Sequence, residues 1–401
     1  MRILYIATEP PLPTINGVRI PLFNSMRLMR EKGHELGLIV ATPDGSDLGA
    51  SVLLSKKELS LAFAHLRHIP RKSFAKVALK SVGMWKLFFQ ERYWCKHVAQ
   101  FIADKVDQFR PDAVHFDLIA TAEYRKVIPR KYHCVLSLND SYTLDISERL
   151  RAGNLTTIER SRKLYELHAS KRIERRLCNQ FDAVHVVSNY DRSALSGIGV
   201  RSNVMVVSNG VDATLSEVAK HSLGNREAIF VGAIKGVKLA YVELLLRTIW
   251  PMVRKQQPSA TLTFVGGVGS DGEVVAREID ASPGVNRVGY VQDLKDVYKL
   301  GGISVVPIDK SNGIINKAIE GMAAGHAVVG YESTFSGVPE ARSGVNCLAC
   351  KTDREFADSI ARLIADAGFL KSVQVNAANL MRLRYSWESR SAEFEKMYFA
   401  C

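Results

Sequence analysis

The 401-residue sequence contains no apolar run near the ~20 residues that a helix needs to cross a bilayer. Its first strand-like segment is followed at once by Glu9 and several prolines, which predicts a short buried strand rather than a signal peptide. We therefore expect a protein that stays in the cytoplasm. Internal repeats and low-complexity tracts are also absent, and hydrophobic residues make up 47% of the chain, so solenoid, disordered and fibrous classes are excluded.

Cysteine is scarce, with six residues scattered along the chain. Only Cys347 and Cys350 form a C-x-x-C, and no second ligand pair lies at a spacing suited to zinc. A redox pair is expected at the start of a helix that follows a strand, whereas this pair lies in a segment predicted to be a short strand. We interpret both residues as structural cysteines.

Acidic residues are fewer than basic ones, 41 against 54, which gives a formal net charge of +13. The excess is concentrated in residues 65–110, where basic and aromatic side chains alternate, and again between Arg149 and Arg176. Such surfaces attract nucleic acid, anionic lipid or an acidic substrate, and composition does not choose among them. We predict that segment 65–110 binds an anionic membrane surface and that no nucleic acid is a partner; a solvated face over an ordinary core is the alternative. Its basic and aromatic residues include Arg67, Arg71, Lys72, Phe74, Lys76, Lys80, Trp85, Lys86, Phe88, Phe89, Arg92, Tyr93, Trp94, Lys96 and Lys105.

Short β-branched runs alternate with helical stretches along the whole chain. This alternation predicts two α/β domains with parallel sheets wound by right-handed crossovers. Turn-forming residues at 208–212 follow a strand and mark the expected seam. The predicted elements are strands 2–7, 35–41, 113–116, 133–138, 183–187, 204–207, 228–231, 261–265, 286–290, 303–307 and 327–331, and a first helix at 20–32.

Three glycines after the predicted strand 261–265 form a literal G-x-G-x-x-G: Gly267, Gly269 and Gly272. In a dinucleotide-binding domain such glycines allow a tight turn and a close approach of the pyrophosphate. Here the strand is the second of its domain rather than the first, and the acidic candidate, Asp293, is predicted to cap a helix. We therefore disfavour an NAD site, although a loop at the C-terminal end of a parallel strand can still face a nucleotide.

The most informative segment runs from Pro307 to the strand at 327–331. A glycine-containing loop follows Pro307, and a helix is predicted from near Ile314 to Gly325. Lys317 would lie in the first turn, where its ammonium and the helix dipole both favour an anion. Glu320 lies three residues on, so both side chains project from one face and suit a diphosphate and ribose hydroxyls. A surface salt bridge of little energetic value is an equally good interpretation of the pair alone.

Residues 320–329 are similar to the donor-site helix of the retaining GT-B glycosyltransferases of family four, whose E-x7-E element ends in E-A-M-A-x-G-x-P-V-V. Further similarities follow in the family's order and cover nearly the whole chain. They are the first loop (10–19), the last N-domain strands and linker (183–188 and 206–212), the strand that opens the C-terminal domain (230–232) and the base-contacting loop (288–291).

The resemblance implies an α/β protein of the GT-B fold, with two facing Rossmann-like domains and an interdomain cleft. Residues 1–209, with a C-terminal helix at 385–401, would bind the acceptor, and residues 210–384 would bind the nucleotide-sugar. The implied reaction is transfer of a sugar, with retention, from a nucleotide-sugar to a saccharide or lipid-linked saccharide in surface polysaccharide synthesis. The enzyme would be cytoplasmic and peripheral at the inner face of the membrane.

The same resemblance assigns roles to individual residues. Asp117, Lys317 and Glu320 would be catalytic, Asp117 because it stands at the second position of a family H-x-H. Composition and position alone would make Asp117 a helix cap and His115 a core residue. The acceptor-side candidates are Arg19, His115 and Asp140, and the donor-binding residues would be Gly17, Lys235, Lys238, Gly266, Gly267, Tyr290, Val291, Asn312, Gly313, Ile314, Ile315, Lys317 and Glu320.

The sequence also departs from the family pattern. Asn312 stands where the first glutamate of E-x7-E is expected, and Ile315 and Ala233 stand where many relatives carry a basic residue. Lys317, with Lys235 or Lys238, is left to neutralise the diphosphate. No D-x-D occurs in the chain, so we expect helix termini and lysines, with no metal or cofactor, to stabilise the leaving group. The alternatives are a non-catalytic GT-B-like partner protein with a decayed donor site, an oxidoreductase that uses the glycine loop, and a nucleotide-sugar epimerase.

Overall fold

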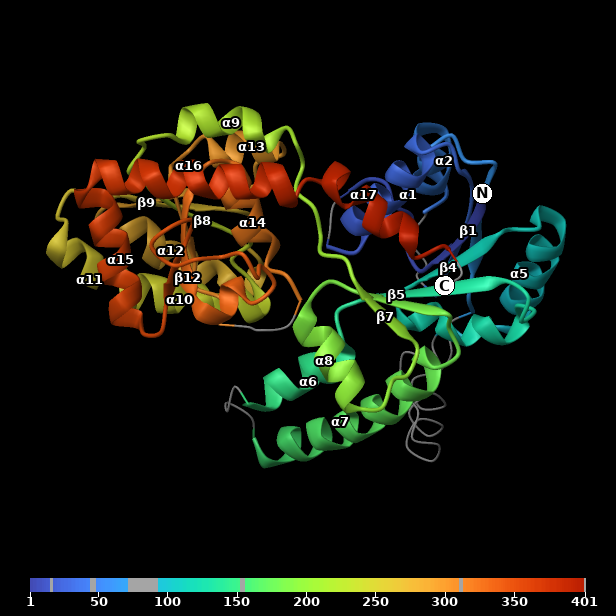
Figure 1. Cartoon of the computed structure of the whole chain (residues 1–401). Helices are drawn as coiled ribbons and strands as arrows, with labels where there is room; N and C mark the ends of the chain where they lie inside the picture. The colour runs from blue at the N-terminus through green and yellow to red at the C-terminus, as the bar shows by residue number, and fades with distance from the viewer. Residues whose placement is uncertain (15–16, 44–47, 71–92, 152–155, 310–312, 400–401) are drawn as a thin grey trace. The chain divides into compact units, whose positions relative to one another are not determined.

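A computed structural model describes residues 1–14, 17–43, 48–70, 93–151, 156–309 and 313–399 (Figure 1). The chain folds into two compact units. The N-terminal unit comprises Met1–Ser208 with Arg390–Cys401, and the C-terminal unit comprises Asn209–Ser389. No helix among the described residues is both long enough and apolar enough to span a membrane.

The described residues of the N-terminal unit form a parallel seven-stranded sheet in the order β3-β2-β1-β4-β5-β6-β7. Its strands are β1 (Arg2–Ala7), β2 (Glu35–Thr42), β3 (Phe63–His68), β4 (Ala113–Asp117), β5 (His133–Asn139), β6 (Ala183–Val186) and β7 (Asn203–Val206). Its helices are α1 (Arg19–Glu31), α2 (Gly49–Glu58), α5 (Lys96–Phe109), α6 (Tyr142–Arg151), α7 (Thr157–Cys178) and α8 (Asn189–Gly197), with a 3-10 segment at Ile119–Val127.

The central strands of this sheet are buried along almost their whole length. In β4 every residue is buried, and in β1 only Arg2 is exposed. This pattern arises because helices cover both faces of a parallel sheet and neither face meets water. All carboxyl ends of the strands lie at one edge, where loops rather than helices determine the chemistry.

The described residues of the C-terminal unit form a second parallel sheet, in the order β10-β9-β8-β11-β12-β13. Its strands are β8 (Ala228–Val231), β9 (Leu262–Val265), β10 (Val285–Val288), β11 (Ile303–Val306), β12 (Ala327–Tyr331) and β13 (Leu348–Cys350). Its helices are α9 (Leu215–Ser222), α10 (Leu239–Leu244), α11 (Trp250–Gln256), α12 (Glu273–Ala281), α13 (Leu294–Tyr298), α14 (Asn316–Ala323), α15 (Asp353–Ala365), α16 (Ala367–Arg384) and the start of α17 (Trp387–Lys396), with a π-helical turn at Leu245–Ile249 and 3-10 turns at Gly236–Lys238, Ser270–Gly272 and Glu332–Phe335.

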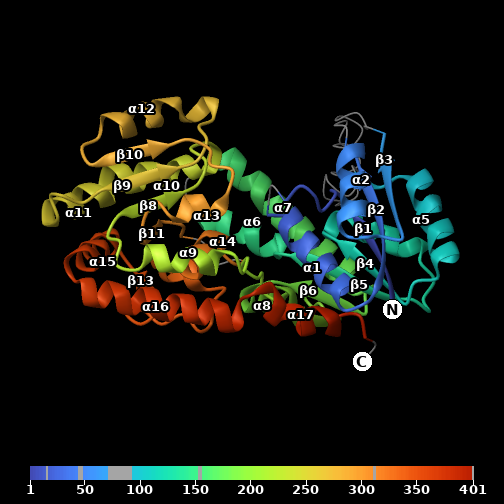
Figure 2. The same ribbon diagram turned by 90° about the horizontal axis from the view of Figure 1, so that it is seen from above.

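Two hydrophobic cores cover the two faces of this second sheet. Helices α10, α11, α12 and α15 pack on one face, and α9, α13, α14 and α16 pack on the other, as Figures 1 and 2 show. Helix α14 therefore has a buried side toward the sheet, while its first turn stays at the carboxyl edge. This placement explains why Lys317 and Glu320 lie at that edge.

The end of α17 and the residues after it complete the core of the N-terminal unit. Phe394, Met397 and Tyr398 are buried there. The Tyr398 hydroxyl lies 2.8 Å from the Tyr5 hydroxyl and 2.9 Å from Nδ1 of His115. A strand near the start of the chain is thus joined to a segment almost 400 residues later, through a hydrogen-bonded chain inside the core.

The predicted α/β architecture with two parallel sheets is confirmed. The bounds of β8 and β12 agree with the prediction, and Cys347 and Cys350 are buried beside the short strand β13. Burial raises the pKa of Cys347 to about 12, which keeps it an unreactive thiol. The prediction missed β3, because His65 and Arg67 interrupt its apolar pattern and the strand lies at an edge of the sheet.

Replacing Tyr398 with Phe removes the hydroxyl that joins Tyr5 to His115 and leaves both polar atoms buried. We expect the free energy of unfolding of the N-terminal unit to fall by about 1–3 kcal/mol. Urea denaturation measures this loss. The control is Phe399→Leu at the neighbouring, half-exposed position, which should change the value by less than about 0.5 kcal/mol. Identical midpoints for Tyr398→Phe and the parent would contradict the expectation.

Candidate nucleotide-sugar site

Helix α14 begins at the carboxyl edge of the C-terminal sheet, after β11 and a loop. Lys317 is its second residue, and Gly325, with a φ of 74°, ends it in the left-handed conformation that glycine favours. Among the described residues no side chain caps its N-terminus, so the amide groups of its first turn face the loop region. The first turn of α14 thus carries uncapped helix amides, the positive end of the helix dipole and an ammonium group, each of which favours an anion.

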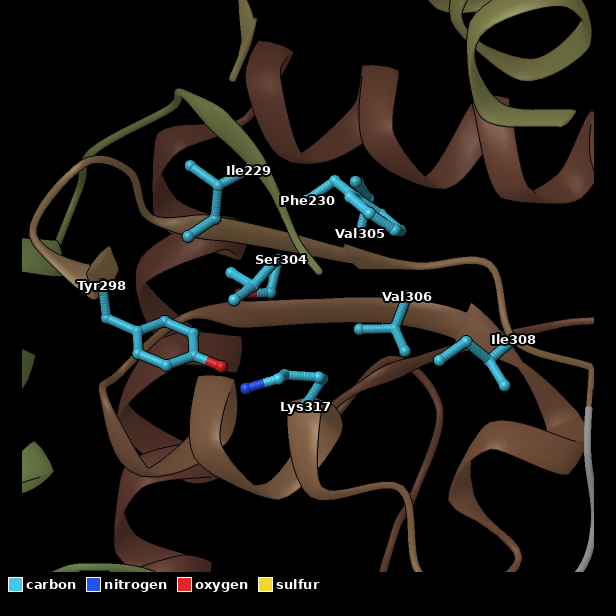
Figure 3. Close-up of a pocket in the computed structure, with 9 residues that line it drawn as sticks. Ile229, Phe230, Tyr298, Ser304, Val305, Val306, Ile308 and Lys317 are labelled. Atoms are coloured by element: carbon cyan, nitrogen blue, oxygen red, sulfur yellow. The ribbon is translucent and has the colours of Figure 1, made fainter. Parts of the chain in front are cut away.

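Lys317 and Glu320 form an ion pair, with 2.8 Å between Nζ and Oε2. The carboxylate is mostly covered, since 14% of the Glu320 side chain is exposed, whereas Lys317 is 34% exposed. The hydroxyl of Tyr298 also donates to Glu320 Oε2, at 3.2 Å. Figure 3 shows the Tyr298 hydroxyl and the Lys317 ammonium directed toward the same region. Two donors on one oxygen fix the orientation of the carboxylate.

Tyr298 is held in place by a buried polar chain. Its ring packs edge-on against His326 at 5.3 Å between centroids, and one nitrogen of His326 lies 2.8 Å from the Tyr298 carbonyl. The other ring nitrogen lies 2.9 Å from the Ser304 hydroxyl of β11. Burial and the neighbouring Glu320 carboxylate raise the pKa of Tyr298 well above its ordinary value, so it remains a proton donor.

A cluster of lysines lies next to this pair. Lys235 and Lys238 follow β8, and the stem of Lys238 passes near Gly232. Desolvation of its ammonium lowers the pKa of Lys238, although the residue as a whole is exposed, and the charges of Lys317 and Lys235 lower the pKa further. The three ammonium groups repel one another and together create a positive electrostatic potential. Binding of an anionic ligand would reduce this repulsion.

A small cavity of about 10 Å³ lies behind Lys317, close to the volume that one water needs. Figure 3 shows that β8, β11 and Tyr298 line it. The cavity leaves room for small movements of the Lys317 stem without a clash.

Packing explains two glycines of the G-x-G-x-x-G pattern. A Cβ at Gly269 would lie 2.7 Å from the Lys235 side chain, and one at Gly272 would lie 2.0 Å from the Ile234 carbonyl oxygen. These glycines let the loop after β9 pack against the loop after β8. Gly267, in contrast, faces open space. Asp293 caps α13 by accepting a hydrogen bond from the Lys295 amide at 2.8 Å, as predicted.

In the N-terminal unit, the carboxyl end of β4 carries a buried carboxyl group. Asp117 is 2% exposed, and its Oδ2 has no hydrogen-bond partner among the described residues. Burial, with a smaller effect from Glu9, raises the pKa of Asp117 to about 8. The next residue, Leu118, has φ 64° and ψ 152°, a conformation that is strained for any residue other than glycine. Strain beside an unpaired buried polar group is typical of functional sites.

Two family models match the chain. The model described as Glycosyltransferase Family 4 covers residues 15–215, and the model described as Glycosyl transferases group 1 covers residues 225–366. The chain belongs to glycosyltransferase family 4. A sequence search among curated proteins finds no match.

Solved glycosyltransferase structures resemble this family 4 chain over its whole length. HepE of Anabaena, in complex with UDP and glucose, is 16% identical, with a TM-score of 0.66 and coverage of 99% of this chain and 98% of that one. Sucrose-phosphate synthase of Thermosynechococcus elongatus is 16% identical, with a TM-score of 0.69 and the same coverage. A TarM variant of S. aureus, in complex with Fondaparinux, alpha-GlcNAc-glycerol and UDP, is 10% identical, with a TM-score of 0.66 and coverage of 99% and 100%.

These likenesses show the GT-B fold. Together with the family match, they make this chain a retaining glycosyltransferase that depends on a nucleotide-sugar. Membership of this family of nucleotide-sugar-dependent enzymes therefore excludes the oxidoreductase, epimerase and non-catalytic alternatives.

Most of the remaining donor-side candidates of this family 4 enzyme lie in loops that follow strands of the C-terminal sheet. Tyr290 is 78% exposed and, with Val291, follows β10. Gly313, with a φ of 68°, and Ile314 pack against Gly337, where an added Cβ would lie 2.7 Å from the Gly313 carbonyl oxygen. Ile315 is the half-buried residue before α14, and Gly266 (φ 152°) lies against the Gly232 carbonyl. Gly17 faces open space in the N-terminal unit. Asn312 lies outside the described residues.

Arg19 and His115 lie deep in the N-terminal unit. Arg19 donates from Nε to Glu9 at 2.7 Å, and 9% of its side chain is exposed. His115 is hydrogen-bonded to Tyr398, and burial lowers the pKa of His115 to about 3, so its ring is neutral.

Asp140, by contrast, is exposed in the loop after β5. Two buried carboxylates that the sequence analysis missed hold this loop. Glu174 of α7 accepts hydrogen bonds from the Tyr142 and Thr143 amides at 2.6 and 3.1 Å, and Asp191 accepts one from the Ser141 amide at 2.8 Å. Both acids lie in helical sequence rich in charge, where nothing distinguishes a buried acid from a solvated one.

In the described part of segment 65–110, Ile69 and one side of α5 are buried, and most other residues are exposed or half-buried. The Arg67 guanidinium lies 3.6 Å from the ring centroid of Phe101, and Trp94 stacks on Tyr124 at 5.3 Å. The basic and aromatic residues of this segment that lie outside the described ranges are Arg71, Lys72, Phe74, Lys76, Lys80, Trp85, Lys86, Phe88, Phe89 and Arg92.

Tyr298→Phe removes one of the two donors to Glu320 Oε2 and loosens the carboxylate. We expect affinity for the donor nucleotide to fall about three- to tenfold, since one hydrogen bond is lost. The matched control is Tyr331→Phe, which removes a tyrosine hydroxyl that donates to Asp353 at 2.5 Å elsewhere in the same unit. Calorimetric titration with the nucleotide measures both. Equal affinities in the two variants would contradict a role of Tyr298 in positioning Glu320.

Asp117→Asn should stabilise the protein at neutral pH. The raised pKa, about 8 against an ordinary 3.8, means that the parent's stability from this group is full below about pH 4 and declines toward pH 8. The variant lacks that decline, so its advantage in free energy of unfolding should grow across this range. Denaturation at several pH values measures it, with the exposed Asp107→Asn as control. A constant difference between variant and parent would rule out the raised pKa.

Proposed function

We propose that this enzyme transfers a sugar from a nucleotide-sugar held by the C-terminal unit to a saccharide acceptor bound by the N-terminal unit. The observation that carries the proposal is the convergence of Lys317, Glu320 and the uncapped start of α14 at the carboxyl edge of the sheet. Lys317 would stabilise the diphosphate as it leaves, and Glu320 would accept hydrogen bonds from the ribose hydroxyls.

Lys238 supports this assignment despite the departures from the family pattern. Its pKa is lowered in part by Lys317, which places the two charges within reach of one ligand. A diphosphate carries charge that Lys317 alone would not balance. Lys238 and Lys235, which both follow β8, would supply the positive charges that Ala233 and Ile315 lack.

Related structures guide the choice of donor. HepE of Anabaena has been solved with UDP-glucose, and the TarM variant has been solved with UDP. Both support UDP-glucose as the first nucleotide-sugar to test. The exposed ring of Tyr290 and the neighbouring Val291 would cover the base.

On the acceptor side, Asp117 would lie near the transferred sugar, and Asp140 and Arg19 would contribute polar groups around it. The unpaired Oδ2 of Asp117 supports this role, because a sugar hydroxyl would satisfy it. The acceptor would be a saccharide or lipid-linked saccharide of a surface polysaccharide, and the enzyme would work in the cytoplasm at an anionic membrane surface.

Two substitutions test the donor site. Glu320→Gln should weaken UDP-glucose binding about tenfold or more, because charge-assisted hydrogen bonds are lost. Lys317→Ala should lower turnover more than affinity, because its charge acts mainly on the departing diphosphate. Calorimetry, steady-state kinetics and melting temperatures separate these effects.

A matched control comes from a second lysine–acid pair at the same spacing. Asp296 and Lys299 form an exposed ion pair at 2.8 Å, and Asp296→Asn should leave donor binding unchanged. If Glu320→Gln behaves like this control, with a modest stability loss and unchanged donor affinity, the pair is a structural salt bridge and the proposed site is wrong.

A further inference from the structure

Helix α7 is only half supported by the rest of the N-terminal unit. Its buried residues all lie in its C-terminal half, from Ala169 to Cys178. Residues 157–168 are exposed or half-buried, and α6 packs beside the helix (Figure 1). At 22 residues the helix is about 33 Å long, so it presents an extended surface to solvent.

One side of α7 carries an unbroken row of exposed residues. Arg160, Leu164, Lys171 and Arg175 follow at spacings of four, seven and four residues, which places them on one helical face opposite the buried residues. Arg172 lies beside this row. We call the four basic residues and Leu164 the α7 basic face.

The acidic residues near this face are already engaged. Glu159 completes the capping box with Thr156, Glu166 pairs with Arg162 and Lys163, and Glu174 is buried. Among the described residues, no ion pair involves the cations of the α7 basic face. Their positive charge is therefore available to an external partner.

The positive surface continues past the C-terminal end of the helix. Arg175 and Arg201 line one open depression, together with Asn179, Gly199 and Ser202. The amide of Arg201 donates to Asn179 at 2.6 Å, which holds the backbone beneath the Arg201 side chain in place. Two guanidinium groups at such a depression suit a phosphate group.

Apolar side chains accompany the cations. Ile158, near the start of α7, is 82% exposed, and Leu164 is 51% exposed. A polyanion such as a nucleic acid offers phosphates but no apolar phase for these side chains. The interface of a bilayer that contains anionic lipid offers both, with phosphates at the surface and acyl chains just below.

We propose that the α7 basic face, with Arg201 and Ile158 at its two ends, docks the enzyme on an anionic phospholipid bilayer. The cations lie against the headgroups, while Leu164 and Ile158 enter the boundary between headgroups and acyl chains. This surface lies outside segment 65–110 and involves none of the residues assigned to sugar transfer.

The test uses the full chain and sedimentation with phosphatidylcholine vesicles, with and without phosphatidylglycerol. Each basic residue near such a surface contributes about 1 kcal/mol, which is about fivefold in partitioning. Lys171→Gln with Arg175→Gln should therefore weaken binding to the anionic vesicles by about 25-fold. Leu164→Gln should also weaken it, and this loss should persist at high salt, because salt screens the charges but not apolar insertion.

The matched control is Lys371→Gln with Arg382→Gln on α16, which removes the same charge from exposed positions of another helix. It should leave vesicle binding within about twofold of the parent. Circular dichroism and melting temperatures establish that all variants fold. Equal losses in the two double variants, or equal binding of the parent to neutral vesicles, would overturn the proposal. So would tighter binding of a single-stranded DNA that shows the same loss, since the face would then belong to a nucleic acid.

Discussion

A single carboxylate oxygen organises the candidate donor site in the C-terminal unit. Glu320 Oε2 accepts from Lys317 in its own helix and from Tyr298 in α13, and Tyr298 is in turn fixed through His326 to Ser304 of β11. Helices α14 and α13 therefore meet at one acceptor, and β11 supports α13 through His326. Because Oε2 is occupied twice, Oε1 is the oxygen left for a ligand, and its direction is set before any ligand arrives. Such preorganisation reduces the entropy lost on binding.

The N-terminal unit, in contrast, contains features that lower its own stability. Around the carboxyl end of β4 it retains features that disfavour folding: Oδ2 of Asp117 has no hydrogen-bond partner in the described part of the chain, and the backbone of Leu118 is strained. Hydrogen bonds hold this segment in place: the Leu118 amide donates to the Ser137 carbonyl at 2.8 Å, and the Thr121 hydroxyl donates to the Asp117 carbonyl at 3.1 Å. A site that is costly in itself but rigidly supported agrees with a role in binding, because selection for stability alone would remove the cost.

The sequence was sufficient for the architecture and for the pairing of Lys317 with Glu320 on one helix face. Strands β8 and β12 are β-branched runs bounded by turn residues, and Lys317 and Glu320 are placed by helical spacing, which is local information. Tyr298 could not be found in this way. Its contact with Glu320 joins residues 22 positions apart through folded geometry, and in the sequence it is one more aromatic residue in an apolar helix.

The glycine loop illustrates another limit of the sequence. Gly269 and Gly272 match a nucleotide-binding pattern, yet each is required because the loop after β8 packs against it. A pattern of glycines indicates that something packs closely against the backbone, but it does not tell whether that is a ligand or another loop of the protein. The buried acids Glu174 and Asp191 are similar, since burial depends on which helix face meets the sheet and not on the charge of the residue.

The buried tail of the chain affects the order in which the protein matures on the ribosome. Tyr398 and its neighbours belong to the core of the N-terminal unit, but they are synthesised only after the whole C-terminal unit. At typical rates of about 5–20 residues per second, the first unit waits about 10–40 s for its last core segment. During that interval the partners of Tyr398, including Tyr5 and His115, lack the hydrogen bonds that they make with it in the folded protein. The N-terminal unit, although made first, is therefore the last to be completed.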